Sequence, residues 1–257
     1  MIRFGLLGSG SKGNAVLIAS ESATILIDNG LSYRQARLRA SAIGQNIDDL
    51  DAVLVTHEHG DHVRGLGVLA RKTRAPVYMT SATYSALPDS IGQIVRREFF
   101  EAGEEIAIKD LTLQSFSVSH DAADPVSFVV GNNGTRLGIA YDLGYASHLV
   151  KTRLARSHAL ILESNYCPEM LRMGPYPPLV QQRIRGRQGH LSNVDMQSLL
   201  AGLLHDGLQE VVLAHISQEN NKHDHACGFA RTALAERLVR VTAAEQDRPT
   251  RLFEVRG

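Results

Sequence analysis

The sequence predicts an α/β protein in which two β-sheets pack face to face and helices cover their outer sides. Two strand-rich stretches, one at the start of the chain and one from residue 104, are each followed by helical segments. Sheets and helices must both bury an apolar face, and this succession lets them do so by stacking in layers. Several strands also end in an acidic residue or a histidine, so one edge of the sandwich would carry these side chains.

The composition is that of an ordinary globular protein and leaves the partner open. Of the 257 residues, 44% are hydrophobic and 21% are charged, and 27 basic residues balance 27 acidic ones. Composition alone therefore indicates neither a nucleic-acid nor a membrane partner. We expect residues 1–257 to form one domain. Two cysteines, Cys167 and Cys227, are too few for a disulfide framework, and neither a secretion signal nor a membrane span is evident, so we expect a cytoplasmic protein.

Hydrophobic periodicity and turn signals place the elements along the chain. In the first half, strands are expected at 2–7, 15–19, 23–27, 52–56 and 76–79, with helices at 32–42, 63–72 and 81–87. In the second half, strands are expected as a pair within 104–118 and at 126–131, 135–141, 158–163, 209–214 and 251–255, with helices at 146–155 and 225–240. The dipeptide Asn133-Gly134 is a strong hairpin signal between two of these strands.

A glycine-rich loop at residues 8–14 follows the first strand. It forms either a flexible turn or a backbone cradle for an anionic ligand. It is not a nucleotide-binding P-loop, because it lacks the Gly-Lys-Ser/Thr ending of that motif.

The clearest chemical signal is a ligand-rich loop at residues 57–62, with the sequence His-Glu-His-Gly-Asp-His, after an apolar strand. In an extended segment His57 and His59 project from the same face, and the glycine then allows a turn that directs Asp61 and His62 elsewhere. Turn chemistry alone does not explain so many ligand side chains, whereas imidazoles and carboxylates suit divalent zinc, manganese or iron. The loop therefore offers ligands in two groups, as two adjacent ions would require.

Other strands repeat this pattern of an apolar run followed by a ligand-type side chain. The strands that end near residues 119, 141 and 214 lead directly to His120, Asp142 and His215. A lone histidine at a strand end is commonly a surface residue, but the repetition of the pattern favours metal ligands. Asp28 follows the strand at 23–27 in the same way and could also be a simple turn residue.

The spacing His-x-His-x-Asp-His resembles the signature of the metallo-β-lactamase-fold hydrolases. This resemblance implies a four-layer αββα sandwich and a hydrolase with two divalent ions, zinc or manganese, with iron as a further option. Asp142 and a hydroxide would bridge the ions, and the hydroxide would attack the substrate. The implied ligands are His57, His59 and His120 for one ion, and Asp61, His62 and His215 for the other.

Further motifs resemble the YycJ (WalJ) branch of this superfamily over nearly the whole chain. They are Ser-Gly-Ser-Lys-Gly-Asn at 9–14, Glu-Ser-Asn at 163–165, Gly-Pro-Tyr-Pro at 174–177, Gly-His-Leu-Ser-Asn at 189–193 and His-Ile-Ser-Gln-Glu-Asn-Asn at 215–221. Ala15 departs from the cysteine that is usual in the branch. The resemblance implies phosphodiester hydrolysis on DNA, with Asp61 in a catalytic role and with His190 contacting the phosphate or protonating the leaving oxygen.

Two departures exclude other branches of the superfamily. The common antibiotic-hydrolysing enzymes carry cysteine at the position of Asp142, and the flavo-diiron oxygen reductases carry glutamate at the position of His59.

Five more residues are expected to support the ligands or to contact the substrate: Asp28, Glu163, Asn165, Arg183 and Ser192. By resemblance, Asp28 orients the histidine loop without binding metal. Ser192 with Asp195 resembles a capping box at a helix N-terminus, where an anion is stabilised. Arg183 belongs to an acid-free, arginine-rich stretch at 170–194, which is either a solvated helix face or a positive rim for phosphates.

The sequence therefore predicts a two-metal phosphodiesterase that acts as a 5′-to-3′ exonuclease on DNA. One alternative is a small-molecule hydrolase that uses the same site on a thioester, lactone or cyclic phosphodiester. Another is a regulatory scaffold that keeps the fold without turnover. A narrow pocket closed by residues 165–188 would favour the small-molecule hydrolase, and an open basic groove would favour the nuclease.

Overall fold

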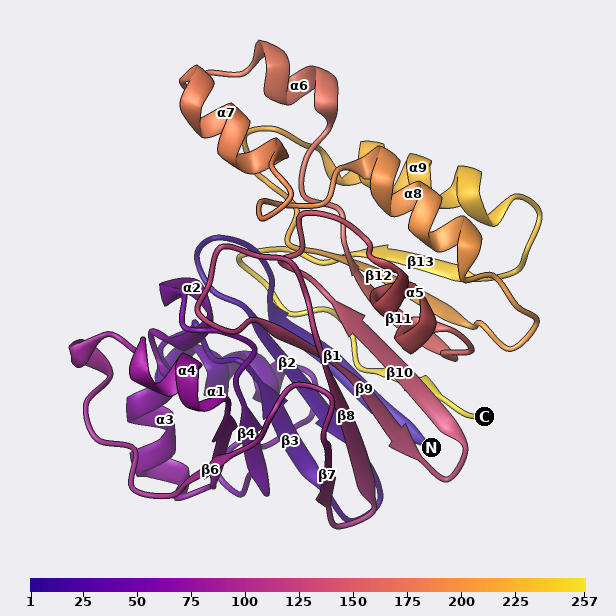
Figure 1. Cartoon of the computed structure of the whole chain (residues 1–257). Helices are drawn as coiled ribbons and strands as arrows, with labels where there is room; N and C mark the ends of the chain where they lie inside the picture. The colour runs from indigo at the N-terminus through magenta and orange to yellow at the C-terminus, as the bar shows by residue number, and fades with distance from the viewer.

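Two seven-stranded β-sheets pack face to face in the computed structural model, which describes residues 1–257 (Figure 1). The first sheet has the order β14 (Phe253–Val255), β1 (Ile2–Gly8), β2 (Ala15–Ala19), β3 (Thr24–Ile27), β4 (Ala52–Leu54), β5 (Val77–Met79) and β6 (Arg97–Phe99). The second has the order β13 (Arg240–Ala243), β12 (Glu210–Ala214), β11 (Ala159–Glu163), β10 (Thr135–Ala140), β9 (Val126–Asn132), β8 (Leu111–Ser117) and β7 (Glu105–Ile108).

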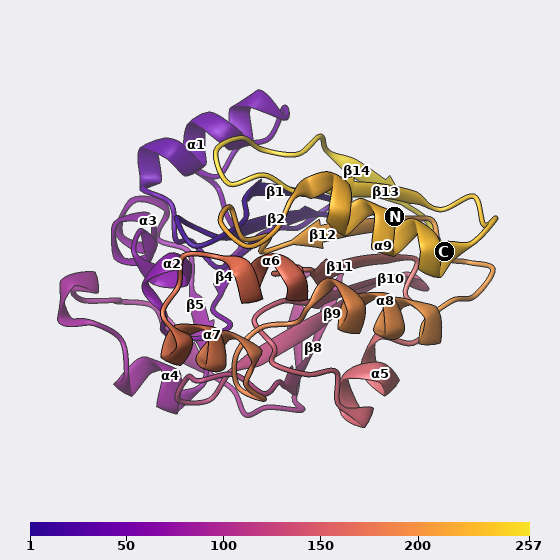
Figure 2. The same cartoon turned by 90° about the horizontal axis from the view of Figure 1, so that it is seen from above.

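Helices cover the outer face of each sheet (Figures 1 and 2). The first sheet is covered by α1 (Tyr33–Ala42), α3 (Leu66–Thr73) and α4 (Ser81–Ser85), with α2 (Gly60–Val63) and a short 3-10 helix (Asp89–Ile91) beside them. The second is covered by α5 (His148–Leu154), α8 (Asn193–Gly202) and α9 (His223–Leu234). Two more helices, α6 (Pro168–Met173) and α7 (Pro178–Arg185), project beyond one edge of the sandwich. None of these helices combines the length and apolar character needed to cross a bilayer.

Three apolar clusters fill the three interfaces between these layers. The central cluster, which includes Phe4 and Phe128, lies between the two sheets. A second cluster joins the first sheet to α1 and α3, and a third joins the second sheet to α5, α8 and α9. Burial of an apolar face on both sides of each sheet is the main stabilising term in such a stack. The four-layer αββα sandwich is therefore confirmed.

The strand directions gather several polar residues at one edge. Strands β3, β4 and β5 run parallel, as do β10, β11 and β12. Parallel neighbours end at the same side of a sheet, and ligand sites form outside these carboxyl ends. The residues that follow β3, β4, β10 and β12 therefore meet at this edge.

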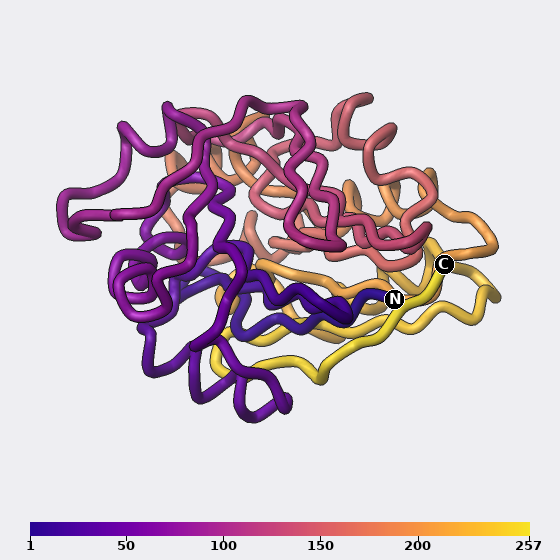
Figure 3. Tube along the Cα trace, turned by 90° about the horizontal axis from the view of Figure 1, so that it is seen from below, coloured from indigo at the N-terminus to yellow at the C-terminus, as the bar shows by residue number.

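The two chain ends lie side by side at the opposite end of the molecule (Figure 3). Strand β14 returns to pair antiparallel with β1, so that Val255 faces Ile2. The last strand thereby becomes part of the first sheet. Just before it, the Thr250 hydroxyl accepts a hydrogen bond from the backbone N–H of Leu6 across 244 residues of sequence.

Most elements lie where periodicity placed them, and the hairpin at Asn133-Gly134 is confirmed, with φ of 45° and 84° at these two residues. The helix expected at 225–240 is wrong at its end: α9 stops at Leu234, and Ala235 has a left-handed φ of 51°. Residues 240–243 form an edge strand that was not predicted, β13, which pairs in parallel with β12. Strand β6 had no recognised signal, because its residues are exposed and carry no apolar alternation.

Close packing between two loops positions the ligand-rich loop at 57–62. A Cβ atom added to Gly30 would lie 1.7 Å from the backbone carbonyl oxygen of Asp61. We therefore expect Gly30→Ala to lower the free energy of unfolding by about 2–3 kcal/mol, because the backbone must shift to relieve the overlap. Urea denaturation measures this. The matched control is Gly202→Ala, where a Cβ meets no atom within 4 Å; equal losses in both variants would contradict the packing.

Candidate metal centre

Three side chains at the site edge follow strands in a backbone conformation that is rare for residues other than glycine. Asp28, Asp142 and His215 have φ of 59°, 52° and 52°. This left-handed region costs a residue with a Cβ atom roughly 1–2 kcal/mol. Such strain persists where the surrounding structure fixes the residue, and it concentrates at functional sites.

His57, His59 and His120 form the first cluster, in which one nitrogen of each ring lies within 4.8 Å of the others. His57 and His120 are buried. The Nε2 atom of His59 is 3.2 Å from the backbone oxygen of Asp121, and the Nδ1 atom of His120 is 3.1 Å from that of Gly189. These hydrogen bonds leave His59 Nδ1 and His120 Nε2, which are 3.3 Å apart, directed at a common point.

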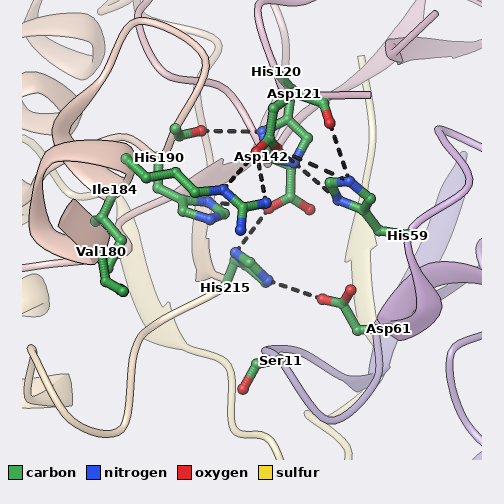
Figure 4. A pocket seen from close by; sticks show the side chains of 12 residues that line it. Ser11, His59, Asp61, His120, Asp121, Asp142, Val180, Ile184, His190 and His215 are labelled. Carbon is green, nitrogen blue, oxygen red and sulfur yellow. Dashed lines mark hydrogen bonds and ion pairs between the residues drawn. The ribbon is translucent and has the colours of Figure 1, made fainter. Parts of the chain in front are cut away.

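Asp61, His62 and His215 form a second cluster of the same size, and Asp142 lies between the two clusters (Figure 4). His57 and His62 form a further group with Asp142. One carboxylate oxygen of Asp142 is 2.7 Å from His62 Nε2, and the other is 3.0 Å from His215 Nδ1. The structure thus brings all seven expected ligands together, with Asp142 placed where a bridging ligand would be needed.

Unpaired buried atoms show that this donor set fits metal ions. His57 Nε2 and both carboxylate oxygens of Asp142 are buried without a hydrogen bond of acceptable geometry. Leaving a buried polar atom unpaired costs about 1–3 kcal/mol. Imidazole nitrogens and carboxylate oxygens are ligands for zinc and manganese, and two bound ions would satisfy all three atoms at once.

Burial and neighbouring carboxylates shift the pKa values of four histidines in the two clusters. Burial lowers the pKa of His57 and His120, which keeps these imidazoles in the neutral form that a metal requires. Burial opposes protonation of His62 and His215 too, but the facing carboxylate of Asp142 raises the pKa of both. A divalent ion competes with the proton for these nitrogens and is attracted by the same carboxylates.

Asp28 is fully buried and supports the ligand-rich loop at 57–62 through hydrogen bonds. Its carboxylate accepts hydrogen bonds from the backbone N–H of Thr56 at 2.8 Å and from the Thr56 hydroxyl at 2.8 Å. It also pairs with His62 Nδ1 at 2.8 Å and accepts from the Tyr141 hydroxyl at 2.9 Å. Asp28 thereby fixes the ring of His62 with Nε2 toward Asp142, and it does not reach the pocket itself.

Glu163 plays a corresponding part on the other side of the site and is also fully buried. Its Oε1 atom lies 2.8 Å from His190 Nδ1 and 3.1 Å from His215 Nδ1. Its Oε2 atom accepts from the backbone N–H groups of Leu143 and Leu191. Burial opposes protonation of His190, yet Glu163 and Asp142 raise the pKa of His190 to about 9.

Asn165 and Ser192 act on the scaffold around this site. The side-chain amide of Asn165 donates to the backbone oxygen of His215 at 2.7 Å. Ser192 caps helix α8 by accepting from the backbone N–H of Asp195 at 3.1 Å, and its hydroxyl donates to the Asp195 carboxylate. Ser192 therefore lies outside the pocket as a helix cap.

A pocket of about 250 Å³ opens onto these side chains (Figure 4). Asp61, His190 and His215 line it, and Val180 and Ile184 of helix α7 form one wall. Its volume is small for a ligand pocket, and α7 forms part of its wall.

Arg183 also reaches this pocket, but its charge is already engaged. Its guanidinium binds the carboxylate of Asp121 through Nε at 2.7 Å and through a terminal nitrogen at 2.6 Å. Asp121 was not among the residues expected from the sequence, although it directly follows His120. Both nitrogens meet the same oxygen, Oδ2, and the arginine side chain is 71% exposed. The pair offsets only part of the charge of Arg183, so the expected positive rim is weaker at this residue than the sequence suggests.

Three other contacts were missed by sequence reasoning. Asn14 of the glycine-rich loop lies 3.1 Å from Asp61 Oδ2 and 3.0 Å from His62 Nε2. The Thr56 hydroxyl is 2.9 Å from His57 Nδ1, and Tyr141 reaches Asp28 across 113 residues of sequence. Thr56 precedes a ligand and Tyr141 precedes Asp142, so position next to a ligand was the available signal for both.

The sandwich fold, with paired histidine and aspartate clusters at one edge, defines a metal-dependent hydrolase. The sequence matches the family described as “Beta-lactamase superfamily domain” over residues 23–216. The chain belongs to this superfamily and has the metallo-β-lactamase fold.

Its relatives confirm the narrower resemblance to the YycJ and WalJ branch. The chain is 38% identical to exodeoxyribonuclease YycJ of Bacillus anthracis, over 88% of this chain and 86% of the relative. It is 33% identical to exodeoxyribonuclease WalJ of Streptococcus pneumoniae, over 85% of this chain and 83% of the relative. A solved metallo-β-lactamase fold protein, YhfI from Bacillus subtilis, matches with a TM-score of 0.73 over 97% of this chain and 99% of its own, at 16% identity.

The role of Asp28 can be tested through metal affinity. In Asp28→Asn an amide N–H₂ would replace one oxygen that accepts hydrogen bonds, so His62 would lose its fixed orientation. We expect the affinity for zinc or manganese to fall by about 10–100-fold in a calorimetric titration. Tyr141→Phe removes one donor and keeps the carboxylate, so its affinity should fall less. Wild-type affinity in Asp28→Asn would refute this supporting role.

Stability should also depend on divalent ions. Ions that bind only the folded chain stabilise it by about 2.7 kcal/mol at a hundredfold excess over Kd. We expect a chelator to lower the Tm of the purified protein and zinc or manganese to restore it. The Tm of His57→Ala should change much less with chelator or metal, because one ligand is missing. A Tm that is indifferent to both chelator and metal would contradict the fit of this donor set.

Proposed function

We propose that this hydrolase is a two-metal phosphodiesterase that acts on DNA as an exonuclease in the 5′-to-3′ direction. The observation that supports it best is the position of His190 beside the two clusters, in a pocket that also contains Asp61 and His215. The exodeoxyribonuclease names of two relatives that cover most of the chain support DNA as the substrate. Residues 1–257 would act as one catalytic domain.

Zinc or manganese, with iron as a further option, would occupy the two clusters, because their imidazole and carboxylate ligands suit these ions. When bound, the ions would supply a water molecule with a lowered pKa as nucleophile and would offset negative charge on the phosphate oxygens. Asp142 would contribute its carboxylate to both clusters. Asp61 would complete the second cluster with His62 and His215.

His190 would contact the phosphate and protonate the leaving oxygen. Its Nδ1 atom faces Glu163 at 2.8 Å and Asp142 at 3.2 Å, whereas its Nε2 atom makes no hydrogen bond within the protein. The two carboxylates favour a proton on Nδ1 and hold the ring so that Nε2 can serve the substrate. Asp28, Glu163 and Asn165 would act by positioning ligands rather than by touching DNA.

The small volume of the pocket, about 250 Å³, supports a second candidate, a hydrolase of a small thioester, lactone or cyclic phosphodiester. Helix α7 forms one wall through Val180 and Ile184, and Arg183 is paired with Asp121. A small walled pocket suits a small substrate, whereas an open basic groove would suit a DNA strand.

A cytoplasmic location would agree with the chemistry of the cysteines. Cys167 and Cys227 are both free, as is usual for thiols in a reducing compartment.

Hydrolysis of labelled DNA separates the two candidates. With zinc or manganese, the protein should release nucleotides progressively from the 5′ end of a DNA strand labelled at its 3′ end. Release from the 3′ end would reverse the proposed direction. Intact single- and double-stranded DNA, together with turnover of a lactone or thioester, would overturn the nuclease and favour the small-molecule hydrolase.

The proposed acid can be removed without removing a metal ligand. We expect His190→Ala to lower kcat on DNA by roughly 10²–10⁴-fold, because general acid catalysis is lost. Its metal content, measured by elemental analysis, should match that of the wild type. His223→Ala is the control, since His223 is an exposed histidine at the start of α9. Loss of metal from His190→Ala would contradict the assigned role.

A further inference from the structure

The glycine-rich loop at residues 8–14 has a fixed shape and is not the flexible turn that the sequence allowed. Gly10 and Gly13 have φ of 133° and 153°, which residues with a Cβ atom rarely adopt. The Asn14 side chain accepts from the backbone N–H of Gly10 at 2.8 Å. The buried side chain of Gln246 accepts from the N–H of Lys12 at 2.9 Å. The loop is therefore held from both sides.

The same hydrogen bonds exclude the backbone cradle that the sequence also allowed. The N–H groups of Gly10 and Lys12 donate to side chains, as described above. The N–H groups of Ser9, Gly13 and Asn14 donate to the backbone oxygens of Glu245, Gly10 and Asp61. Ser11 alone keeps a backbone N–H without a partner, and one amide does not make an anion nest. An anion near this loop must be held by side-chain charge.

Two cations next to this loop have no carboxylate partner. Lys12 is exposed and adjoins Ser11, which lines the metal pocket. Arg64 is exposed, follows Asp61 by three residues, and places its guanidinium 3.4 Å from the backbone oxygen of Lys12. In Figure 4, Ser11 and Asp61 lie on the side of the pocket away from Val180 and Ile184. Lys12 and Arg64 thus belong to the rim opposite helix α7.

Of the acids near this loop, Glu245 pairs with Arg248, whereas Asp247 is exposed and forms no ion pair. On the other rim, the Arg183 guanidinium is bound by Asp121. Exposed arginines without an ion pair also lie beyond Arg183, at Arg185 and Arg187. On the side of the glycine-rich loop, the free positive charge beside the pocket is that of Lys12 and Arg64.

We propose that Lys12 and Arg64 form a phosphate-binding rim that holds the backbone of a nucleic-acid strand beside the metal pocket. This proposal rests on the nuclease function proposed above and names the surface that contacts the phosphates next to the cleaved one. Exposed lysine and arginine side chains bind phosphates mainly through charge, so the contact should depend strongly on salt and little on base sequence.

The double variant Lys12→Ala/Arg64→Ala tests the rim with a DNA strand and with bis(p-nitrophenyl) phosphate, a small phosphodiester that carries no flanking phosphates. On DNA at low salt we expect KM to rise roughly tenfold with kcat unchanged, because two phosphate contacts are lost. The slope of log(kcat/KM) against log[salt] should become shallower by about two. Turnover of the small phosphodiester should stay at the wild-type level, since the metal clusters are intact.

The matched control is Arg34→Ala/Lys72→Ala, which removes the same charge from exposed positions on the outer helices α1 and α3. This control should behave as the wild type on both substrates. An equal loss in the control and in the rim variant would overturn the rim, because net charge would then explain the effect. An unchanged KM on DNA would overturn it too, as would an equal loss on the small phosphodiester. Wild-type protein that leaves DNA intact would instead overturn the nuclease function itself.

Discussion

The buried carboxylate of Asp28 is the interaction on which the rest of the site depends. It is fully buried, and a buried charge is tolerated only where it is paired and hydrogen-bonded. Its partners come from both halves of the sandwich: Thr56 and His62 follow β4 of the first sheet, whereas Tyr141 follows β10 of the second. Separating the two sheets at this edge would break the hydrogen bond from Tyr141, while Thr56 and His62 would stay with Asp28 in the first sheet. The Tyr141 bond therefore couples the packing of the two sheets to the geometry of the candidate metal centre.

Glu163 repeats this arrangement on the far side of Asp142. It is buried, anchored by two backbone N–H groups, and turned toward His190 and His215. The two carboxylates hold imidazoles whose other nitrogens face the site, which is how supporting groups fix the orientation of metal ligands. Together with the left-handed backbone at Asp28, Asp142 and His215, they give a centre that is organised before metal or substrate arrives. Catalysis by positioned charge requires this, because reorganising ligands during the reaction would add to the barrier.

The two sheets with outer helices, and the side chains that gather at the site, could be predicted from the sequence because both leave local signals. The spacing within residues 57–62 and the polar residue after each apolar strand are visible without knowledge of the fold. The pairing of Arg183 with Asp121 was not visible, because 62 residues separate them and only the folded chain shows which acid an arginine meets. The same holds for Tyr141 and Asp28.

The glycine-rich loop was correctly located but left ambiguous, since the destinations of its N–H groups depend on Glu245 and Gln246 near the other end of the chain. Strand β13 was not predicted, because an edge strand is defined by its neighbour as much as by its own residues.

Anomalous X-ray diffraction from crystals soaked in manganese would locate the ions independently of activity. We expect two peaks per chain, one among His57, His59 and His120 and one among Asp61, His62 and His215, with Asp142 in contact with both. A single peak, or peaks away from these side chains, would contradict a paired-ion centre built on the ends of the strands.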